Sequence, residues 1–173
     1  MYLEIRTHDD IDRYVATVQA AAARTQAWIS AHAGDPMNLL RSMKFETVGF
    51  HPIGEHSLNV VEQINQTFTY AVALAAVREL LVRHPESGGF RLAPGAHMSQ
   101  PLDIMSEAEG MVGAETFAAV SPGNNGKLAK DLKKLAGCSE RYRYVFFASP
   151  RFPGIARLPQ FERGGIEVWS VDA

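Results

Sequence analysis

A strand–helix–strand succession in the second half of the chain constrains the fold more than any other feature. Apolar runs predict strands over 111–120 and 143–148. Between them, residues 124–136 carry leucines on one side and lysines on the other, the pattern of an amphipathic helix. Because two strands joined by a helical crossover run parallel in one sheet, the chain is predicted to be an α/β protein.

The first half of the chain is predicted to be mainly helical. Apolar residues at three- and four-residue intervals predict long helices over 9–33 and 58–84, and a short helical segment is expected at 37–43. Together with the parallel pair, these elements predict a mixed sheet flanked by helices, with an extra N-terminal helix. The remaining extended segments are expected at 44–50, 90–92 and 166–171.

A predicted hairpin carries the one pair of acidic residues that indicates a functional site. The runs Pro101–Ile104 and Gly113–Val120 flank the polar turn Ser106–Gly110, and symmetric pairing about this turn places Asp103 opposite Glu115. Opposed residues on one sheet face have Cβ atoms roughly 4.5–5.5 Å apart. Two carboxylates at that distance repel each other and raise one pKa unless a cation lies between them. The pair therefore predicts a metal site.

Length and charge limit the function classes. At 173 residues the chain is expected to be one domain, residues 1–173. Residues 1–120 hold 8 basic and 14 acidic side chains, whereas residues 121–173 hold 9 and 5. This asymmetry is compatible with a polyanion-facing surface and equally with a solvated helix face. The basic cluster consists of Lys127, Lys130, Lys133, Lys134, Arg141 and Arg143.

Cysteine content and hydropathy indicate the compartment. Cys138 is the single cysteine, which excludes an intramolecular disulfide framework and a cysteine-based zinc site. The N-terminus has no basic-then-apolar signal segment, and no apolar run is long enough to span a bilayer. We therefore expect a cytoplasmic protein without a membrane partner.

The element order and the acidic residues together resemble the PD-(D/E)xK nuclease-like superfamily, which has the restriction-endonuclease-like fold. Asp103 matches the motif's Asp, and Glu115 matches its (D/E) twelve residues later. Glu62 matches the acidic residue often found on the helix before the sheet. The resemblance implies an αβββαβ core.

The resemblance covers part of the chain. It implies a nuclease-like core over 57–150, preceded by an N-terminal helical extension (1–56) and followed by a C-terminal extension (151–173).

The chain departs from the motif at its lysine. The family places a Lys two residues after the Glu, and this chain has Phe117 there. Members of the superfamily sometimes supply the Lys from the following helix, and Lys127 and Lys130 are both available substitutes. Gln66 is a candidate contact for water or phosphate, or alternatively a hydrogen-bond partner of Glu62 on the same helix.

The resemblance implies a metal-dependent nuclease. Asp103, Glu115 and Glu62 would hold Mg²⁺ or Mn²⁺, since hard oxygen ligands suit these ions. Hydrolysis of a phosphodiester in DNA, less favourably RNA, would serve restriction, repair or defence, and nucleases of this fold often act as homodimers. Glu62 is explained equally well by a capping box with Asn59.

The sequence is also compatible with two other functions. Phe117 at the lysine position favours a catalytically inactive binding or assembly subunit of the same fold. A structural oligomerisation module, with helix 9–33 as its partner surface, is the third alternative.

Overall fold

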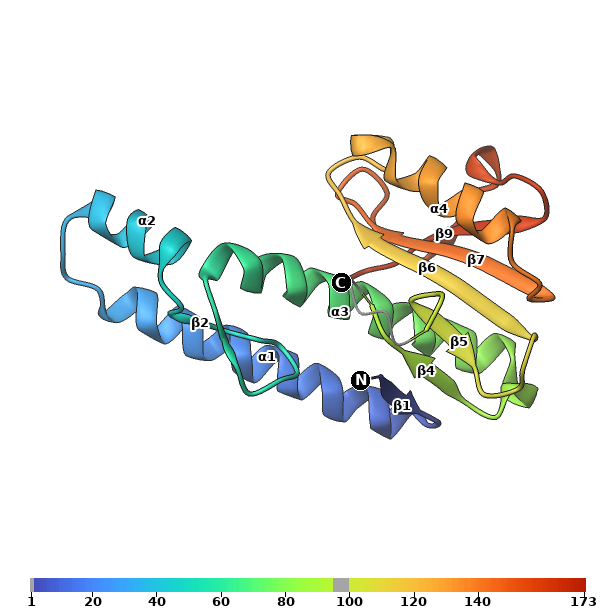
Figure 1. Cartoon of the computed structure of the whole chain (residues 1–173), viewed down its shortest axis with the longest axis horizontal. Helices are drawn as coiled ribbons and strands as arrows, with labels where there is room; N and C mark the ends of the chain where they lie inside the picture. Colours follow the sequence, from blue (N-terminus) through green and yellow to red (C-terminus); the bar gives the residue numbers. More distant parts are fainter. Residues whose placement is uncertain (1, 95–99) are drawn as a thin grey trace.

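The protein, described by a computed structural model for residues 2–94 and 100–173, is built around one mixed β-sheet with helices on both faces (Figure 1). The predicted α/β class with a mixed sheet is confirmed. The helices are α1 (His8–Ala31), α2 (Pro36–Phe45), α3 (Val60–Arg83) and α4 (Lys127–Ala136). The main-sheet strands are β1 (Leu3–Ile5), β4 (Phe90–Leu92), β5 (Ile104–Ser106), β6 (Val112–Ala118), β7 (Tyr142–Ala148), β8 (Ala156–Arg157) and β9 (Ile166–Ser170). A separate two-stranded ribbon consists of β2 (Gly49–Phe50) and β3 (Ser57–Leu58).

The seven described strands of the main sheet lie in the order β1-β4-β5-β6-β7-β9-β8. The pairs from β1 to β6 are antiparallel, whereas β6, β7 and β9 run parallel to one another. α4 connects β6 to β7, and Val112 lies opposite Tyr142 in the parallel ladder. The predicted crossover between two parallel strands is confirmed.

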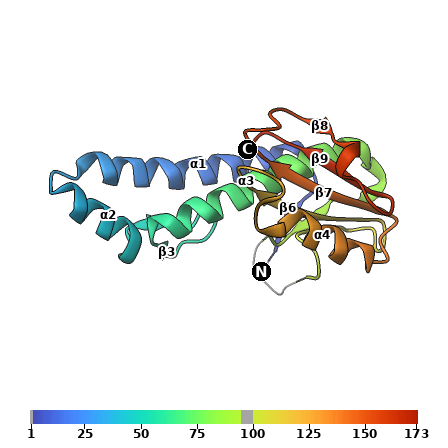
Figure 2. The ribbon, with the colours of Figure 1, turned by 90° about the horizontal axis from the view of Figure 1, so that it is seen from above.

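The sheet is buried on both faces. α1 and α3 cover one face and α4 covers the other (Figure 2). Successive residues of β7 point to opposite faces. Accordingly, Tyr144 and Phe146 pack in the core beneath α3, while Val145 and Phe147 pack beneath α4. The continuous apolar run of β7 follows from this two-sided burial.

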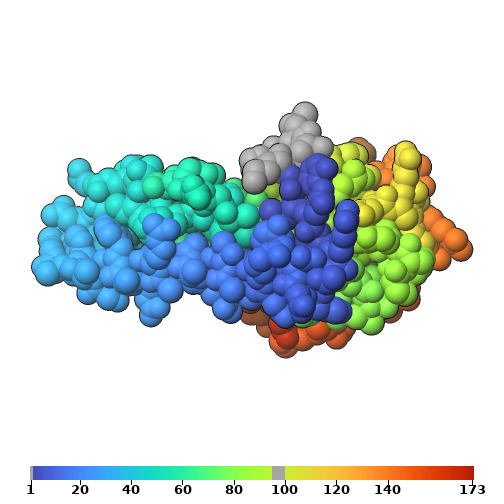
Figure 3. Space-filling model, turned by 90° about the horizontal axis from the view of Figure 1, so that it is seen from below, coloured from blue at the N-terminus to red at the C-terminus, as the bar shows by residue number. Residues whose placement is uncertain are grey.

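An arm made of the C-terminal part of α1, α2 and the first half of α3 extends beyond the sheet (Figures 1 and 3). Its centre is held by the buried side chain of Gln63 on α3. Gln63 Oε1 accepts hydrogen bonds from Thr25 Oγ1 at 2.5 Å and from the Phe50 backbone N–H at 2.8 Å. Its Nε2 donates to the carbonyl of Ala21 at 3.2 Å. One side chain therefore joins α1, β2 and α3.

The hairpin has the predicted register but different strand limits. Ile104 lies opposite Ala114, the pairing that symmetry about the turn predicts. The predicted first strand, 101–104, is wrong in its bounds, because β5 begins only at Ile104. Asp103 lies just before the strand, where its carboxylate accepts a hydrogen bond from the backbone N–H of Thr116 on β6.

Four other segments differ from expectation. α2 continues to Phe45, so the expected extended segment at 44–50 is reduced to β2. A turn with positive φ at Asn125 and Gly126 precedes α4, which therefore starts at Lys127 rather than 124. β1 and β8 are too short, at 3 and 2 residues, to be recognised from periodicity.

None of the described helices has both the length and the apolar content that a bilayer crossing requires.

Candidate functional site

Asp103 and Glu115 meet at the point where the β5–β6 ladder ends. The backbone N–H of Asp103 donates to Oε1 of Glu115 at 3.3 Å, and both residues are buried. Leu102 anchors the segment before Asp103 by packing against Gly113, where a β-carbon would collide with its Cδ1. The hairpin register and this close approach bring the predicted acidic pair together.

The carboxylate of Asp103 has structural partners of its own. Oδ2 accepts from the Thr116 backbone N–H at 2.8 Å and from Thr116 Oγ1 at 3.0 Å. It thereby satisfies a buried N–H of β6 that the short strand β5 does not reach. Asp103 is consequently held in one orientation beside Glu115.

Glu115 points from β6 toward the lysines of α4. Its side chain is only 3% exposed, and Oε1 accepts from Lys134 Nζ at 2.6 Å. Lys127 Nζ lies 3.9 Å from Oε2. Burial and, next, the charge of Asp103 raise the pKa of Glu115, while Lys134 opposes the increase. The repulsion expected between the paired carboxylates thus acts on Glu115.

Asp131 on α4 is a third acidic member that the sequence reasoning missed. Its Oδ1 accepts from Lys127 Nζ at 2.5 Å, whereas its buried Oδ2 has no hydrogen-bond partner among the residues that the structure describes. Burial raises the pKa of Asp131, and Lys127 opposes this. The available signal was helical spacing, since Leu128, Asp131 and Leu135 occupy one buried face of α4.

The charges alternate through the site. Lys134, Glu115, Lys127 and Asp131 form a chain of neighbouring opposite charges, with Asp103 beside Glu115. Three carboxylates therefore share two ammonium groups, and the cluster carries an excess negative charge when all five are ionised. Such a site attracts a further cation, and its amines are suited to contact a phosphate.

Phe117 occupies the position where the resembling family has its lysine. It is buried on the α4 side of β6, like Glu115, and its ring stacks on Phe147 with centroids 5.4 Å apart. Side chains from α4 complete this apolar cluster. An ammonium at position 117 would be buried in the cluster, so the amines beside Glu115 come from the helix instead.

The remaining predicted site residues lie apart from this cluster in the contacts of the described chain. Glu62 is exposed in the first turn of α3, where its backbone N–H donates to Asn59 Oδ1 at 2.8 Å. Asn59 is therefore the N-cap of α3, and of the expected capping box the structure shows the bond from the Glu62 N–H to the Asn59 side chain. Gln66 is half-buried one turn later, and Lys130 is exposed on α4.

The oxygen donors suit a hard divalent cation. Within residues 2–94 and 100–173, no group of three His, Cys, Asp or Glu side chains is placed to hold a metal ion. Mg²⁺ is commonly bound by one or two carboxylates, with water and substrate phosphate filling its other positions. Asp103 and Glu115 supply that number of carboxylates, and Oδ2 of Asp131 has no hydrogen-bond partner among the described residues.

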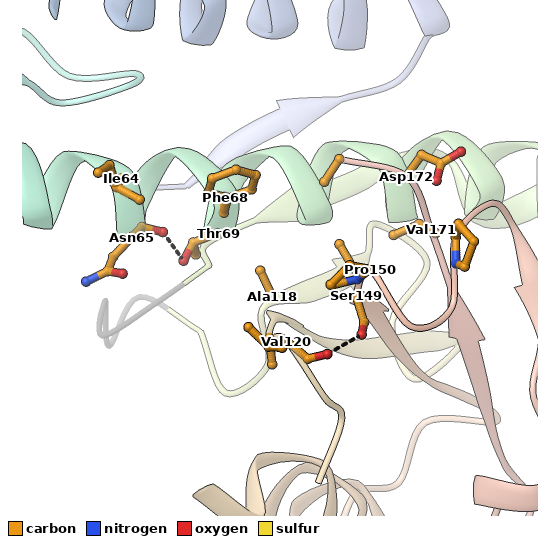
Figure 4. A pocket seen from close by; sticks show the side chains of 14 residues that line it. Ile64, Asn65, Phe68, Thr69, Ala118, Val120, Ser149, Pro150, Val171 and Asp172 are labelled. Carbon is orange, nitrogen blue, oxygen red and sulfur yellow. Dashed lines mark hydrogen bonds between the residues drawn. The ribbon is translucent and has the colours of Figure 1, made fainter. Parts of the chain in front are cut away.

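A cavity of about 570 Å³ lies at the carboxyl ends of β6 and β7 (Figure 4). Ile64 and Phe68 of α3 form its apolar wall. The hydroxyl of Ser149 donates to the Val120 carbonyl at 2.9 Å and is thus already used within the wall. Ligands of α/β sheets often bind at the carboxyl ends of parallel strands, so this cavity is a second candidate site.

Comparison of the chain with protein-family models, with curated proteins and with solved structures found no match. The resemblance to the nuclease-like superfamily therefore depends on the element order and on the residues of the hairpin.

Proposed function

We propose that the protein is a Mg²⁺-dependent phosphodiesterase of the restriction-endonuclease-like class that cleaves nucleic acid, DNA in preference to RNA. The observation that carries the proposal is the meeting of Asp103 and Glu115 beside an amine from α4, with Lys127 Nζ 3.9 Å from Glu115 Oε2. This is the combination of two carboxylates and one cation that the family motif would otherwise supply from a single hairpin.

The element order supports the same proposal. The succession α3, β4, β5, β6, α4, β7 has the αβββαβ order of the resembling core. The acidic residues lie at its central hairpin and the lysines on its second helix, as the relocated-lysine variant of the motif requires. A homodimer, which would allow two sites to cut both strands of a duplex, is part of the proposal.

Each group has a distinct role in this scheme. Asp103 and Glu115 would hold the metal ion, which when bound would activate water and stabilise the departing oxygen. Thr116 orients Asp103 through two hydrogen bonds to Oδ2. Lys127, held by Asp131, would offset negative charge on the scissile phosphate.

Three further residues would act around this centre. Lys130 on the exposed side of α4 would contact the substrate backbone. Glu62 and Gln66 would join only if substrate extends along α3, since each now faces solvent at least in part.

Cleavage assays test the proposal directly. Purified protein is incubated with supercoiled plasmid, linear duplex, single-stranded DNA and RNA in Mg²⁺ or Mn²⁺, beside Asp103→Ala and Glu115→Gln variants. Glu109→Gln, which removes an exposed acid from the same hairpin turn, is the matched control. Metal-dependent cleavage that both site variants lose and the control keeps supports the proposal. Cleavage no greater than that of Asp103→Ala contradicts it.

One observation favours a second candidate, a catalytically inactive binding or assembly subunit. Glu115 Oε1 already has an ammonium partner, and Asp103 Oδ2 already accepts two hydrogen bonds. A cluster satisfied in this way needs no metal ion, and in this candidate its role is to attach α4 to the sheet. This candidate predicts no rise in melting temperature with Mg²⁺ or Mn²⁺, whereas metal binding to the native state raises it by mass action.

A further inference from the structure

The two lysines beside Glu115 are held to different degrees. Lys127 Nζ lies 2.5 Å from Asp131 Oδ1 in addition to its contact with Glu115 Oε2. Lys134 Nζ is bound to Glu115 Oε1 alone among the carboxylates of the described chain. The side chain of Lys134 is also the more exposed, at 47% against 39%. Lys134 is therefore the amine that can leave the site more easily.

Lys134 occupies the oxygen of Glu115 that lies next to Asp103. Glu115 Oε1 accepts from Lys134 Nζ at 2.6 Å and from the Asp103 N–H, on the side where the two acidic residues meet. A Mg²⁺ ion binds carboxylate oxygens at about 2.0–2.1 Å. Two like charges cannot share one oxygen in a buried site without strong repulsion. Metal binding between Asp103 and Glu115 is consequently in competition with Lys134.

We propose that Lys134 is a displaceable internal cation that neutralises Glu115 in the metal-free protein and must leave Oε1 before a divalent ion binds there. This proposal rests on the proposed function, because it concerns the same metal site. Lys127 remains in place when Lys134 leaves. The site thus has one resident amine and one that competes with the metal ion.

The cost of moving each lysine explains this division. Lys134 has a flexible stem and an exposed side chain, so its ammonium can turn into water without leaving the helix surface. Departure of Lys127 would instead remove the ammonium partner of Asp131. The side chain of Asp131 is 4% exposed, and one of its oxygens already has no hydrogen-bond partner among the described residues. An unpaired buried carboxylate is strongly unfavourable. Asp131 is therefore the residue that keeps Lys127 beside Glu115.

Metal-binding calorimetry tests the proposal without any measurement of cleavage. Mn²⁺ is titrated into the wild-type chain and into Lys134→Met, Lys134→Arg and Lys133→Met. Lys133 is an exposed neighbour on the same helix, so its variant controls for the loss of one positive charge. We expect Lys134→Met to bind Mn²⁺ about tenfold more tightly than wild type, because a charge-assisted hydrogen bond no longer competes. Lys134→Arg and Lys133→Met should stay near wild type.

Equal Mn²⁺ affinity of Lys134→Met and Lys133→Met overturns the proposal, as does failure of every variant to bind. A second measurement covers the case in which Lys134→Met does not fold. Acetylation of lysines in the wild-type chain is followed by mass spectrometry with and without Mn²⁺. Lys134 should become more reactive when Mn²⁺ is added, and Lys127 should not. Unchanged reactivity of Lys134 at saturating Mn²⁺ contradicts displacement.

The binding results and the cleavage assays separate the two proposals. Competition at Lys134 without cleavage of any nucleic acid would refute the proposed activity and retain the displaceable cation. Metal-dependent cleavage with no effect of Lys134→Met on Mn²⁺ affinity would support the proposed activity and refute the displaceable cation.

Discussion

Lys134 of α4 places its Nζ 2.6 Å from Oε1 of Glu115 on β6, a carboxylate that is almost completely buried. This ion pair joins the helix and the strand in addition to the apolar contacts of Leu128 and Leu135. It also limits the rise in the pKa of Glu115, since the charge of Lys134 opposes the larger effects of burial and of Asp103.

Glu115→Gln is expected to become more stable relative to wild type as pH rises. Burial raises the pKa of Glu115, so the native state holds its proton more tightly than the unfolded chain does. The free energy of unfolding contributed by this group therefore falls as pH rises from about 4 through the raised pKa. Glu115→Gln has no titrating group at this position, so it does not lose this contribution. In chemical denaturation, its free energy of unfolding should therefore increase relative to that of wild type as pH rises, and the difference should become constant above the raised pKa.

Glu109→Gln is the control for this comparison, because Glu109 is exposed. A difference between Glu115→Gln and wild type that is constant over the whole pH range would show that Glu115 has the same pKa in both states.

Lys127→Met and Lys130→Met distinguish the two substitutes for the motif lysine. Lys127 lies beside Glu115, so its loss is expected to lower kcat about a hundredfold, as for other groups that stabilise transition-state charge. Lys130 is exposed, and its loss should weaken nucleic-acid binding. It should also reduce the slope of log affinity against log salt concentration by about one. Steady-state cleavage kinetics and salt titrations measure these effects. The opposite assignment of the two phenotypes would exclude Lys127 as the relocated lysine.

Phe117→Lys restores the family's lysine in sequence but should not restore its function. Phe117 is buried and stacks on Phe147. Loss of the ring alone costs about 3–5 kcal/mol, and burial of an ammonium adds to it. We expect a large fall in melting temperature by circular dichroism, with Phe117→Leu as the milder control. A stable Phe117→Lys variant with greater cleavage activity would contradict our account of α4 as the source of the amine.

Gln63→Ala tests the attachment of the arm. Its amide bonds to Thr25, to the Phe50 N–H and to the Ala21 carbonyl, all of which lose a partner in the variant. We expect a loss of about 2–3 kcal/mol in the free energy of unfolding. Gln66→Ala, one turn along α3, should stay within about 0.5 kcal/mol of wild type. Equal losses in urea denaturation would show that the buried network contributes nothing specific.

The acidic pair was predictable because a hairpin is a local structure. Its register depends on the turn and on strand alternation, both of which are properties of neighbouring residues. The pairing of Ile104 with Ala114 therefore followed from the sequence, although β5 starts later than predicted. The start of β5 differs from the prediction because the Asp103 side chain, and not a backbone carbonyl, accepts from the Thr116 backbone N–H. The spacing of apolar residues does not reveal such a side-chain bond.

Sequence by itself determined the long helices α1 and α3, the β6–α4–β7 crossover and the proximity of Asp103 to Glu115, since each follows from patterns within a short span. Only tertiary structure decided that Lys134 and Lys127, with Asp131, surround Glu115 while Lys130 faces outward. The rotation of α4 about its axis depends on how its leucines pack in a cluster that includes residues outside the crossover, such as Leu102 and Val168 of β9. That packing is a property of the assembled core, so the identity of the site's cations became defined only when the helix docked on the sheet.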